Sequence, residues 1–499
     1  MPGSICSAGR RRKQGDVRRR TVALAILAIT LLGAAVRLGT LDRQSFWFDE
    51  LVTVSLLHRG FASMLAQIPQ SEATPYLYYV IAWPWTRLFG FGEVGLRSLS
   101  AVAGAAIVPV VYSVGATLVS RRAGVIAAAL VAVNPFLVWY AQEARSYSVF
   151  ALFAALTVLF FARALRGSRR SQAAWAVAAS LAVATHYFAV FLVAAEAAWL
   201  LFRARPRRPV LLASLLPTAI LLAHLPLILK QRNTGEAVST SGLAGRVVGI
   251  PKDLLVGYSF PLELPGSVAA AMLALLGLAL MFTATPAATR RAASVAGALA
   301  AAYLAVPLVI AVVGSDYVIA RNMVAVVVPA AVFLAAGYAT NWLGIAAAGT
   351  LCALSLAIVL AVATDVRYGR TDWRGAAKAV APATFERAIV VTPDIGREVW
   401  KPYLSGLREP AGSTVSVREI VMLGLATEGG FSTGAVHPPE ATPRTPPHGF
   451  RLVATQRTST FALVRYRSAS GPAPVPTARL PELRLSSVQP GVFLQQRRP

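Results

Sequence analysis

Charged residues are scarce in this sequence. Asp, Glu, Lys and Arg make up only 14% of the chain, whereas soluble domains carry about 25%. Hydrophobic residues make up 56% of the chain. The composition therefore excludes a soluble protein and places most of the apolar side chains in lipid.

Cysteine is nearly absent, which limits the chemistry available to the chain. Cys6 lies in a basic stretch and Cys352 lies within an apolar run, so the two are not expected to meet. A disulfide framework and a cysteine metal site are therefore excluded. The five histidines show no spacing typical of metal ligands, and the sequence has no glycine-rich nucleotide loop.

Acidic residues are the rarer charge. The sequence has 22 Asp and Glu against 48 Lys and Arg, which gives a net charge of +26. The basic residues form short clusters between apolar runs, a pattern that argues against a nucleic acid partner. It favours contact with the anionic headgroups of membrane lipids and a role in setting the topology.

Long apolar segments predict an α-helical polytopic membrane protein. A helix needs about 20 apolar residues to cross a bilayer, and eleven segments qualify as candidates. They cover residues 21–39, 98–119, 123–140, 146–165, 171–186, 188–203, 209–229, 267–284, 292–313, 322–340 and 342–363. The first segment has no small-residue cleavage site before Arg37, so we expect an uncleaved anchor rather than a signal peptide.

The basic clusters predict the orientation. They occur at every second connection, and the cytoplasmic loops of membrane proteins carry such an excess of Lys and Arg. The cytoplasmic side then receives the tail at residues 1–20 and the clusters at 121–122, 163–170, 203–208 and 290–291. The acidic and titratable residues of the other connections gather on the outer face, together with the C-terminus.

Residues 75–91 are apolar enough to cross the membrane, but a crossing there would reverse every later basic cluster. We therefore expect a juxtamembrane helix in the outer interface, where its Tyr and Trp residues suit the aromatic belt. With residues 40–97 as outer loop and juxtamembrane helix, the transmembrane domain would cover residues 21–364.

The composition changes beyond residue 364, where charges and spaced prolines return. Short apolar segments predict strands at 388–392, 414–420, 451–455 and 461–466, and residues 372–381 predict a helix. These elements indicate a small α/β domain at residues 365–469 on the outer face. We expect a loop at 430–448 and a disordered tail at 470–499, because both are rich in proline.

Two adjacent carboxylates follow the first apolar segment. Asp49 and Glu50 come directly after Phe46, Trp47 and Phe48. At a membrane surface they would be partly desolvated, so one of them would suit a general base or a metal ligand. The alternative is an aromatic anchor followed by helix-capping acids.

Three further sites on the outer face hold polar residues close to the membrane. Glu143 and Arg145 suit either a structural ion pair or a phosphate site. His186 interrupts a long apolar stretch, where it would satisfy a tight turn or serve a function. Arg321 enters a late apolar segment, where it would anchor the chain or bind an anion. Because these residues share one face with the acid pair, we expect a site for an anionic, membrane-held substrate.

An ordered series of motifs resembles the GT-C membrane glycosyltransferases. The likeness is greatest to the branch of protein O-mannosyltransferases and the lipid A aminoarabinose transferase, and it covers residues 1–380. The motifs are Trp47-Phe48-Asp49-Glu50, Thr74-Pro75-x-x-Tyr78-Tyr79, Leu88-Phe89-Gly90-x-x-Glu93-x-x-x-Arg97-x-Leu99-Ser100, Gln142-Glu143-Ala144-Arg145-x-Tyr147, Thr185-His186-Tyr187, Arg321 and Asp372-Trp373-Arg374.

The resemblance implies transfer of a sugar from a polyprenyl-phosphate donor to an acceptor hydroxyl, with inversion at the anomeric carbon. The acceptor would be a glycan, lipid or protein of the cell envelope, outside a bacterial cytoplasmic membrane. Asp49 would be the catalytic base, with Glu50 beside it. The donor phosphate would be bound by Arg145, His186 and Arg321, with support from Glu143, Tyr147 and Tyr187.

Some GT-C enzymes use a divalent metal ion. Asp49, Glu50 and Glu143 are the nearby oxygen ligands, and the sequence leaves metal use open.

Two other functions remain open. A secondary transporter would also have many spans, but it would show repeats and polar groups near the bilayer midplane. A lipid-linked glycan ligase would share the outer-face site and would favour a long outer loop with an Arg and His pair. Residues 230–265 are the candidate loop, and they contain no His.

Overall fold

The computed structural model describes residues 3–204, 206–231, 242–314, 316–381, 385–394, 396–426 and 437–496. The chain forms two compact units. The helical unit comprises Met1–Leu41, Arg59–Tyr258 and Leu264–Leu360. The sheet unit comprises Asp42–His58, Ser259–Glu263 and Ala361–Pro499.

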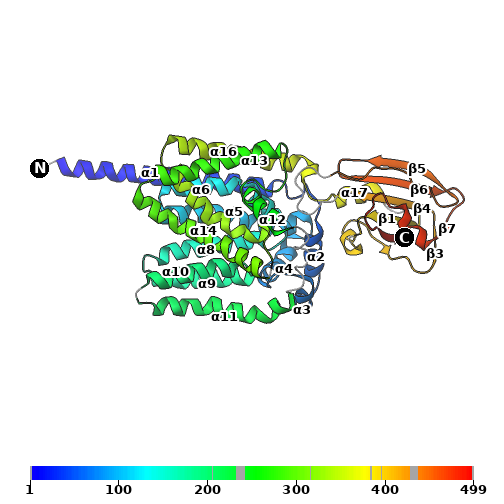
Figure 1. The fold of residues 1–499 in the computed structure, drawn as a ribbon, viewed down its shortest axis with the longest axis horizontal. Coiled ribbons are helices and arrows are strands. Elements are labelled where there is room, and N and C mark those ends of the chain that lie inside the picture. The colour runs from blue at the N-terminus through cyan, green and yellow to red at the C-terminus, as the bar shows by residue number, and fades with distance from the viewer. Residues whose placement is uncertain are drawn as a thin grey trace. The chain divides into compact units, whose positions relative to one another are not determined.

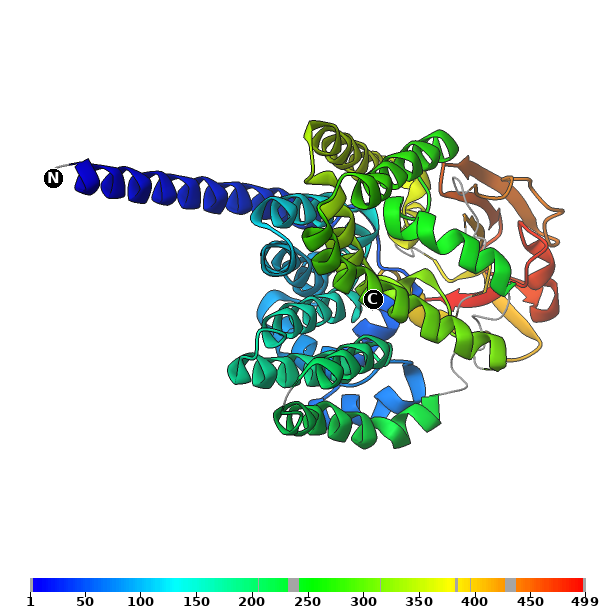
Figure 2. The ribbon, with the colours of Figure 1, turned by 60° about the vertical axis from the view of Figure 1, so that its left-hand side comes forward.

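The helical unit is a bundle of long helices that run mostly along one direction (Figure 1). Its core contains large apolar side chains with no exposed surface, among them Phe136, Phe150 and Trp175. The N-terminal part of α1 extends beyond the other helices (Figure 2). The elements are α1 (Gly3–Leu38), α3 (Phe61–Ser71), α4 (Leu77–Phe89), α5 (Glu93–Leu118), α6 (Arg121–Val133), α7 (Pro135–Ala141), α8 (Tyr147–Ala164), α9 (Arg169–Thr185), α10 (Ala189–Arg203), α11 (Arg208–Gln231), α12 (Leu243–Val256), α13 (Glu263–Thr283), α14 (Ala287–Val313), the 3-10 helix η2 (Ala320–Val326), α15 (Val327–Tyr338) and α16 (Trp342–Thr364).

The prediction of a polytopic helical membrane protein is confirmed. In the described residues, eight helices are long and apolar enough to cross a membrane, or nine if α6 and α7 form one bent span. Nine of the eleven predicted segments each coincide with one α-helix, whereas 123–140 is divided between α6 and α7 and 322–340 between η2 and α15. However, α9 has 17 residues and α10 has 15, fewer than the roughly 20 that a straight crossing needs.

The apolar segment 123–140 is broken at Asn134, and the helices on either side meet at 56°. Asn134 caps the start of α7, because its Oδ1 accepts the Leu137 N–H at 2.9 Å. The last carbonyls of α6 are satisfied by Arg37, which donates to Ala132 at 2.6 Å and to Val131 at 3.0 Å. A helix can break at this depth because these polar groups replace the missing backbone bonds.

A buried carboxyl group joins three helices of the bundle. Glu196 of α10 has no exposed surface, and it accepts hydrogen bonds from Thr157 of α8 at 3.0 Å and from Trp175 of α9 at 2.8 Å. A carboxyl group without partners would be costly in this apolar surrounding. The two donors therefore specify how α8, α9 and α10 pack.

The sheet unit contains a mixed six-stranded sheet in the order β2-β8-β1-β4-β6-β5. Strands β1 and β4 are parallel, with Ile389 opposite Val421, and the other pairs are antiparallel. Helix α17 packs against β4 and β6, so the predicted small α/β fold is present. The elements are α2 (Phe48–Leu57), α17 (Trp373–Val380), β1 (Arg387–Thr392), β2 (Leu407–Arg408), β3 (Thr414–Val417), β4 (Glu419–Leu425), β5 (Phe450–Arg457), β6 (Phe461–Ser468), β7 (Ala473–Pro476) and β8 (Gly491–Gln495).

Two expectations for the C-terminal region were wrong. The segment 414–420 is not one strand: β3 pairs with β7 in a separate two-stranded sheet, and β4 begins at Glu419. The tail from residue 470 is not disordered in its described part, to residue 496. It contains β7 and β8, and Phe493 and Leu494 of β8 are buried where this strand pairs with β1.

Two further predictions concern the basic segment at residues 1–20 and the loop at residues 430–448. The basic segment expected as a tail at residues 1–20 is helical from Gly3 and continuous with the first span. Of the expected loop at 430–448, residues 430–436 lie outside the described residues, and 437–448 contain no helix or strand.

A buried carboxylate at the start of β4 forms ion pairs with three arginines. Glu419 is 3% exposed, and its oxygens lie 2.9 Å from Arg465, 3.0 Å from Arg467 and 3.4 Å from Arg387. Burial alone would raise the pKa of Glu419, but the three guanidinium groups outweigh burial and hold the pKa below its ordinary value.

We predict that Glu419→Gln destabilises the sheet unit by about 3 kcal/mol, because it leaves buried arginines without their counter-charge. The lowered pKa means that the stabilisation is complete above about pH 5 and is lost as the pH falls through the folded value. Hydrogen exchange of β4 amides in the full-length protein, measured against pH, checks both points.

Glu386→Gln is the matched control. Glu386 lies 3.8 Å from Arg408, and both side chains are about half exposed, so this change should have little effect on stability. Equal losses for the two variants would contradict the role of Glu419.

Candidate functional site

The connection between α7 and α8 carries an arginine held by a distant acid. Arg145 is 7% exposed, and its Nη1 and Nη2 atoms each lie 2.8 Å from an oxygen of Glu72, which follows α3. Arg145 also donates to the Tyr79 hydroxyl at 3.2 Å. Two parallel hydrogen bonds fix the guanidinium plane. Glu72 was not among the predicted site residues, because it lies in another connection of the chain.

The Tyr79 hydroxyl stays protonated in this arrangement. Tyr79 lies on the predicted juxtamembrane helix, and burial raises the pKa of its hydroxyl well above the ordinary value. The positive charge of Arg145 opposes this shift, and the negative charge of Glu72 adds to it.

Gln142 joins the same connection to the end of α1. Its amide nitrogen donates to the Val36 carbonyl at 2.9 Å and to the Thr40 hydroxyl at 2.6 Å. Since the last carbonyls of a helix have no partner within the helix, this side chain both caps α1 and holds the Arg145 segment in place.

His186 lies in the turn between α9 and α10 and is 4% exposed. Its ring stacks on Phe150, with 4.8 Å between the ring centroids and an interplanar angle of 12°. The Phe188 N–H donates to Nδ1 at 3.3 Å, so the neutral ring carries its proton on Nε2.

Arg321 is half-buried near the start of η2, and the segment before it is held by a second ion pair. Arg246 of α12 donates to the Asp316 carboxylate through both Nη atoms, at 3.0 Å for Nη1, and to the Val318 carbonyl at 2.6 Å. These bonds hold the pKa of Asp316 below its ordinary value. Arg246 was noted in the sequence only as part of a loop.

The predicted phosphate-binding residues lie in one region of the helical unit. Arg321 and Arg145 both act electrostatically on His186. The charges of Arg321 and Glu143 act in opposite directions on the hydroxyls of Tyr140 and Tyr258, which hydrogen bond to each other. The Tyr147 ring lies 4.8 Å from Tyr140 and 5.8 Å from His186. We call Arg145, His186 and Arg321 the cationic cluster, after its two arginines; the His186 ring is neutral and contributes an N–H donor.

Tyr187, predicted to support this site, has a different partner. Its hydroxyl donates to Gln231 at 2.6 Å, and Gln231 donates to the Ile68 carbonyl at 3.4 Å. These contacts join the end of α11 to α3.

The two predicted acids lie in α2 of the sheet unit and differ in their surroundings. Glu50 has no exposed surface, and its carboxylate accepts the Trp47 N–H at 3.2 Å, which caps the helix. Asp49 is half-buried in the first helical turn, where a negative charge is favourable. The sequence left open whether these two acids cap a helix. Glu50 does cap the start of α2.

The segment that carries Asp49 is attached to the C-terminal domain within the sheet unit. The Ser45 hydroxyl donates to the Thr371 carbonyl at 2.9 Å, and the Phe46 N–H donates to the Tyr403 hydroxyl at 2.9 Å. Arg374 donates to the carbonyl of Arg43 at 3.2 Å and to that of Asp42.

The Asp372-Trp373-Arg374 motif thus has structural roles. Asp372 caps α17 by accepting the Gly375 N–H at 2.8 Å. The Trp373 ring packs on Trp400, with 5.3 Å between centroids. Arg374 holds the chain that precedes Asp49.

No group of three or more His, Cys, Asp or Glu side chains is arranged to hold a metal ion within the residues that the structure describes.

The chain is distantly similar to three solved membrane transferases. ArnT from Cupriavidus metallidurans bound to undecaprenyl phosphate is 15% identical, with 63% of this chain and 60% of that chain covered and a TM-score of 0.44. The oligosaccharyltransferase AglB from Archaeoglobus fulgidus is 12% identical, covers 72% and 58%, and has a TM-score of 0.47. The Pmt1-Pmt2 complex of S. cerevisiae is 18% identical, covers 43% and 33%, and has a TM-score of 0.34.

No curated protein matches the sequence. The chain spans about 60% of the length of the ArnT structure. Residues 73–229 match the family model for dolichyl-phosphate-mannose-protein mannosyltransferase. This range contains Arg145 and His186, and the match confirms the resemblance to the GT-C membrane glycosyltransferases that the motifs indicate.

Proposed function

We propose that this protein is an integral membrane glycosyltransferase. It moves a sugar from a polyprenyl-phosphate donor to an acceptor hydroxyl of the cell envelope, on the outer face of a bacterial cytoplasmic membrane. The observation that carries the proposal is the cationic cluster, which gathers three nitrogen-bearing side chains among buried aromatic residues. The mannosyltransferase family match over residues 73–229, which include Arg145 and His186 but not Arg321, supports it.

The cluster suits a phosphate that gains charge as it leaves. When the bond between the anomeric carbon and the phosphate oxygen breaks, the donor diester becomes a monoester, and fixed cations stabilise the added charge. Arg145 already uses both Nη atoms on Glu72, whereas Arg321 is the more exposed of the two arginines. We therefore assign the direct phosphate contact to Arg321 and the Nε2–H of His186, and a longer-range electrostatic role to Arg145.

Asp49 is our proposed base. It takes the proton of the acceptor hydroxyl, whose oxygen attacks the anomeric carbon while polyprenyl phosphate departs from the opposite side. One base and one leaving group are enough for this single displacement, which inverts the anomeric carbon. Glu50 is bound in the cap of α2 and is not assigned this role.

We predict that Asp49→Asn lowers kcat about 100-fold or more, because it removes general base catalysis without changing side-chain shape. The measurement is release of polyprenyl phosphate from radiolabelled polyprenyl-phosphate sugars by the purified protein in lipid. Glu50→Gln is the control, because glutamine keeps the capping contact and activity should persist.

Near-normal turnover by Asp49→Asn would disprove the assignment of the base. Absence of release with every donor, together with ligand-dependent flux in sealed vesicles, would favour a transporter.

We predict that Arg321→Ala raises the donor KM by about 10- to 100-fold with the fold intact, because the variant loses one charge-assisted hydrogen bond to the donor phosphate.

Arg145→Ala should instead destabilise the protein, because it leaves Glu72 buried and unpaired. The double variant with Glu72→Ala should recover part of that stability. Thermal unfolding and donor KM of Arg321→Ala, Arg145→Ala, Glu72→Ala and the double variant separate binding from folding. Additive stability losses for the Arg145 and Glu72 changes would contradict the ion pair.

We predict that Arg374→Ala lowers kcat by about 10- to 100-fold with little change in the donor KM, because it releases the segment that positions Asp49. Arg374→Lys keeps one donor and should restore part of the rate. Arg367→Ala removes an exposed ion pair with Asp365 and is the matched control. Parallel changes of kcat and KM in Arg374→Ala would argue against a positioning role.

A further inference from the structure

A cavity of about 340 Å³ lies between the middle of α1 and the helices α5 and α6. The residues that α1 contributes to the cavity belong to the first turns of the membrane span Arg19–Leu38. The connection that carries Arg145 is attached near the other end of this span, where Gln142 binds the Val36 carbonyl. It is lined by Arg19, Val22, Ala23, Ile26, Tyr112 and Arg121.

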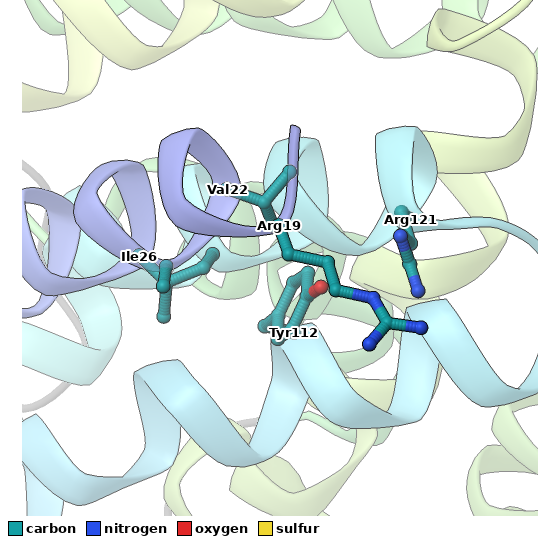
Figure 3. Close-up of a pocket in the computed structure, with 6 residues that line it drawn as sticks. Arg19, Val22, Ile26, Tyr112 and Arg121 are labelled. Carbon is teal, nitrogen blue, oxygen red and sulfur yellow. The ribbon is translucent and has the colours of Figure 1, made fainter. Parts of the chain in front are cut away.

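Two positive charges from different helices meet at this cavity. Figure 3 shows the Arg19 side chain extending past Tyr112 toward Arg121. Both arginines are exposed, and no acidic side chain among the described residues forms an ion pair with either. Two cations that share a concave surface repel each other, and an anion bound between them would relieve this repulsion.

The cavity is apolar beyond its charged end. Val22 and Ala23 follow Arg19 by three and four residues along α1, and Ile26 continues the same face. This stripe runs from the first residue of the membrane span into the part that faces hydrocarbon. A ligand that fits it has an anionic head at the membrane surface and an apolar chain that extends into the bilayer.

We propose that this cavity binds an anionic glycerophospholipid of the surrounding membrane. Arg19 and Arg121 hold the phosphate, the Tyr112 hydroxyl lies beside it, and one acyl chain follows Val22, Ala23 and Ile26. The volume suits a headgroup and the first part of a chain, and the bilayer accommodates the rest of the lipid. Basic pockets between transmembrane helices recognise anionic headgroups in this way. The proposal does not depend on the glycosyltransferase function.

The test measures binding of phosphatidylglycerol to the purified full-length protein in detergent by native mass spectrometry, with phosphatidylcholine of the same chains as the comparison. Phosphatidylglycerol should bind more tightly, because phosphatidylcholine carries its own cation. Arg19→Gln and Arg121→Gln should each weaken binding about fivefold, which corresponds to the roughly 1 kcal/mol expected for one basic residue at the membrane surface.

Arg20→Gln with Arg122→Gln is the matched control. These neighbours are also exposed and carry the same charge, but they do not line the cavity, so binding should change little. Ala23→Phe keeps every charge and fills the apolar groove from an exposed position, so it should weaken binding without unfolding the protein.

Three outcomes would overturn the proposal. Equal losses in the control pair and the cavity pair would mean that only the surface charge attracts the lipid. Unchanged binding by Ala23→Phe would exclude the groove. Displacement of phosphatidylglycerol by equimolar polyprenyl phosphate would assign the cavity to the lipid carrier.

Discussion

The membrane interior contains no water, so each backbone group there needs a partner within the protein. The helical unit meets this constraint at the break between α6 and α7, where Arg37 binds the last carbonyls of α6 and Asn134 caps α7. These contacts allow the chain to turn by 56° inside a segment that would otherwise be one span. The connection that follows carries Gln142, which binds the end of α1. The placement of Arg145 therefore depends on a polar network that satisfies two helix ends.

Ion pairs between distant connections then orient the site. Glu72 holds Arg145 through two bonds of 2.8 Å, and Asp316 is held by Arg246 just before Arg321. Each ion pair joins a short connection between helices to another part of the bundle. These connections are neither helix nor strand, and the ion pairs hold them in one conformation. Such pre-organisation would favour the glycosyl transfer that we propose, because cations fixed in advance need no rearrangement when charge develops on a leaving phosphate.

The sequence was sufficient for those features that follow from local composition. Long apolar runs located the helices, and short apolar segments located β1, β5 and β6, because the length of an apolar segment can be seen in the local sequence. The partner of Arg145 was not predicted, since Glu72 and Arg145 are neighbours only after the helices pack. Strand β8 was missed because its five residues follow a proline-rich stretch, and its strand conformation comes from pairing with β1. The break of segment 414–420 likewise reflects two different sheets, which local pattern cannot distinguish.

The shortage of acidic residues explains which arginines are buried with a partner and which lie exposed at the surface. With 22 acidic residues against 48 basic ones, the chain has too few carboxylates to pair one with every guanidinium group. Buried arginines use the scarce acids or backbone carbonyls: Arg145 binds Glu72, Arg246 binds Asp316, and Arg37 binds the end of α6. Glu419 serves three arginines at once. Burial of an unpaired charge is costly. Arg19 and Arg121, which within the described residues bind neither an acid nor a carbonyl in the way these buried arginines do, lie at exposed positions. Those are the positions where phosphates from the membrane can reach them, so a basic excess in this chain favours anionic lipid ligands.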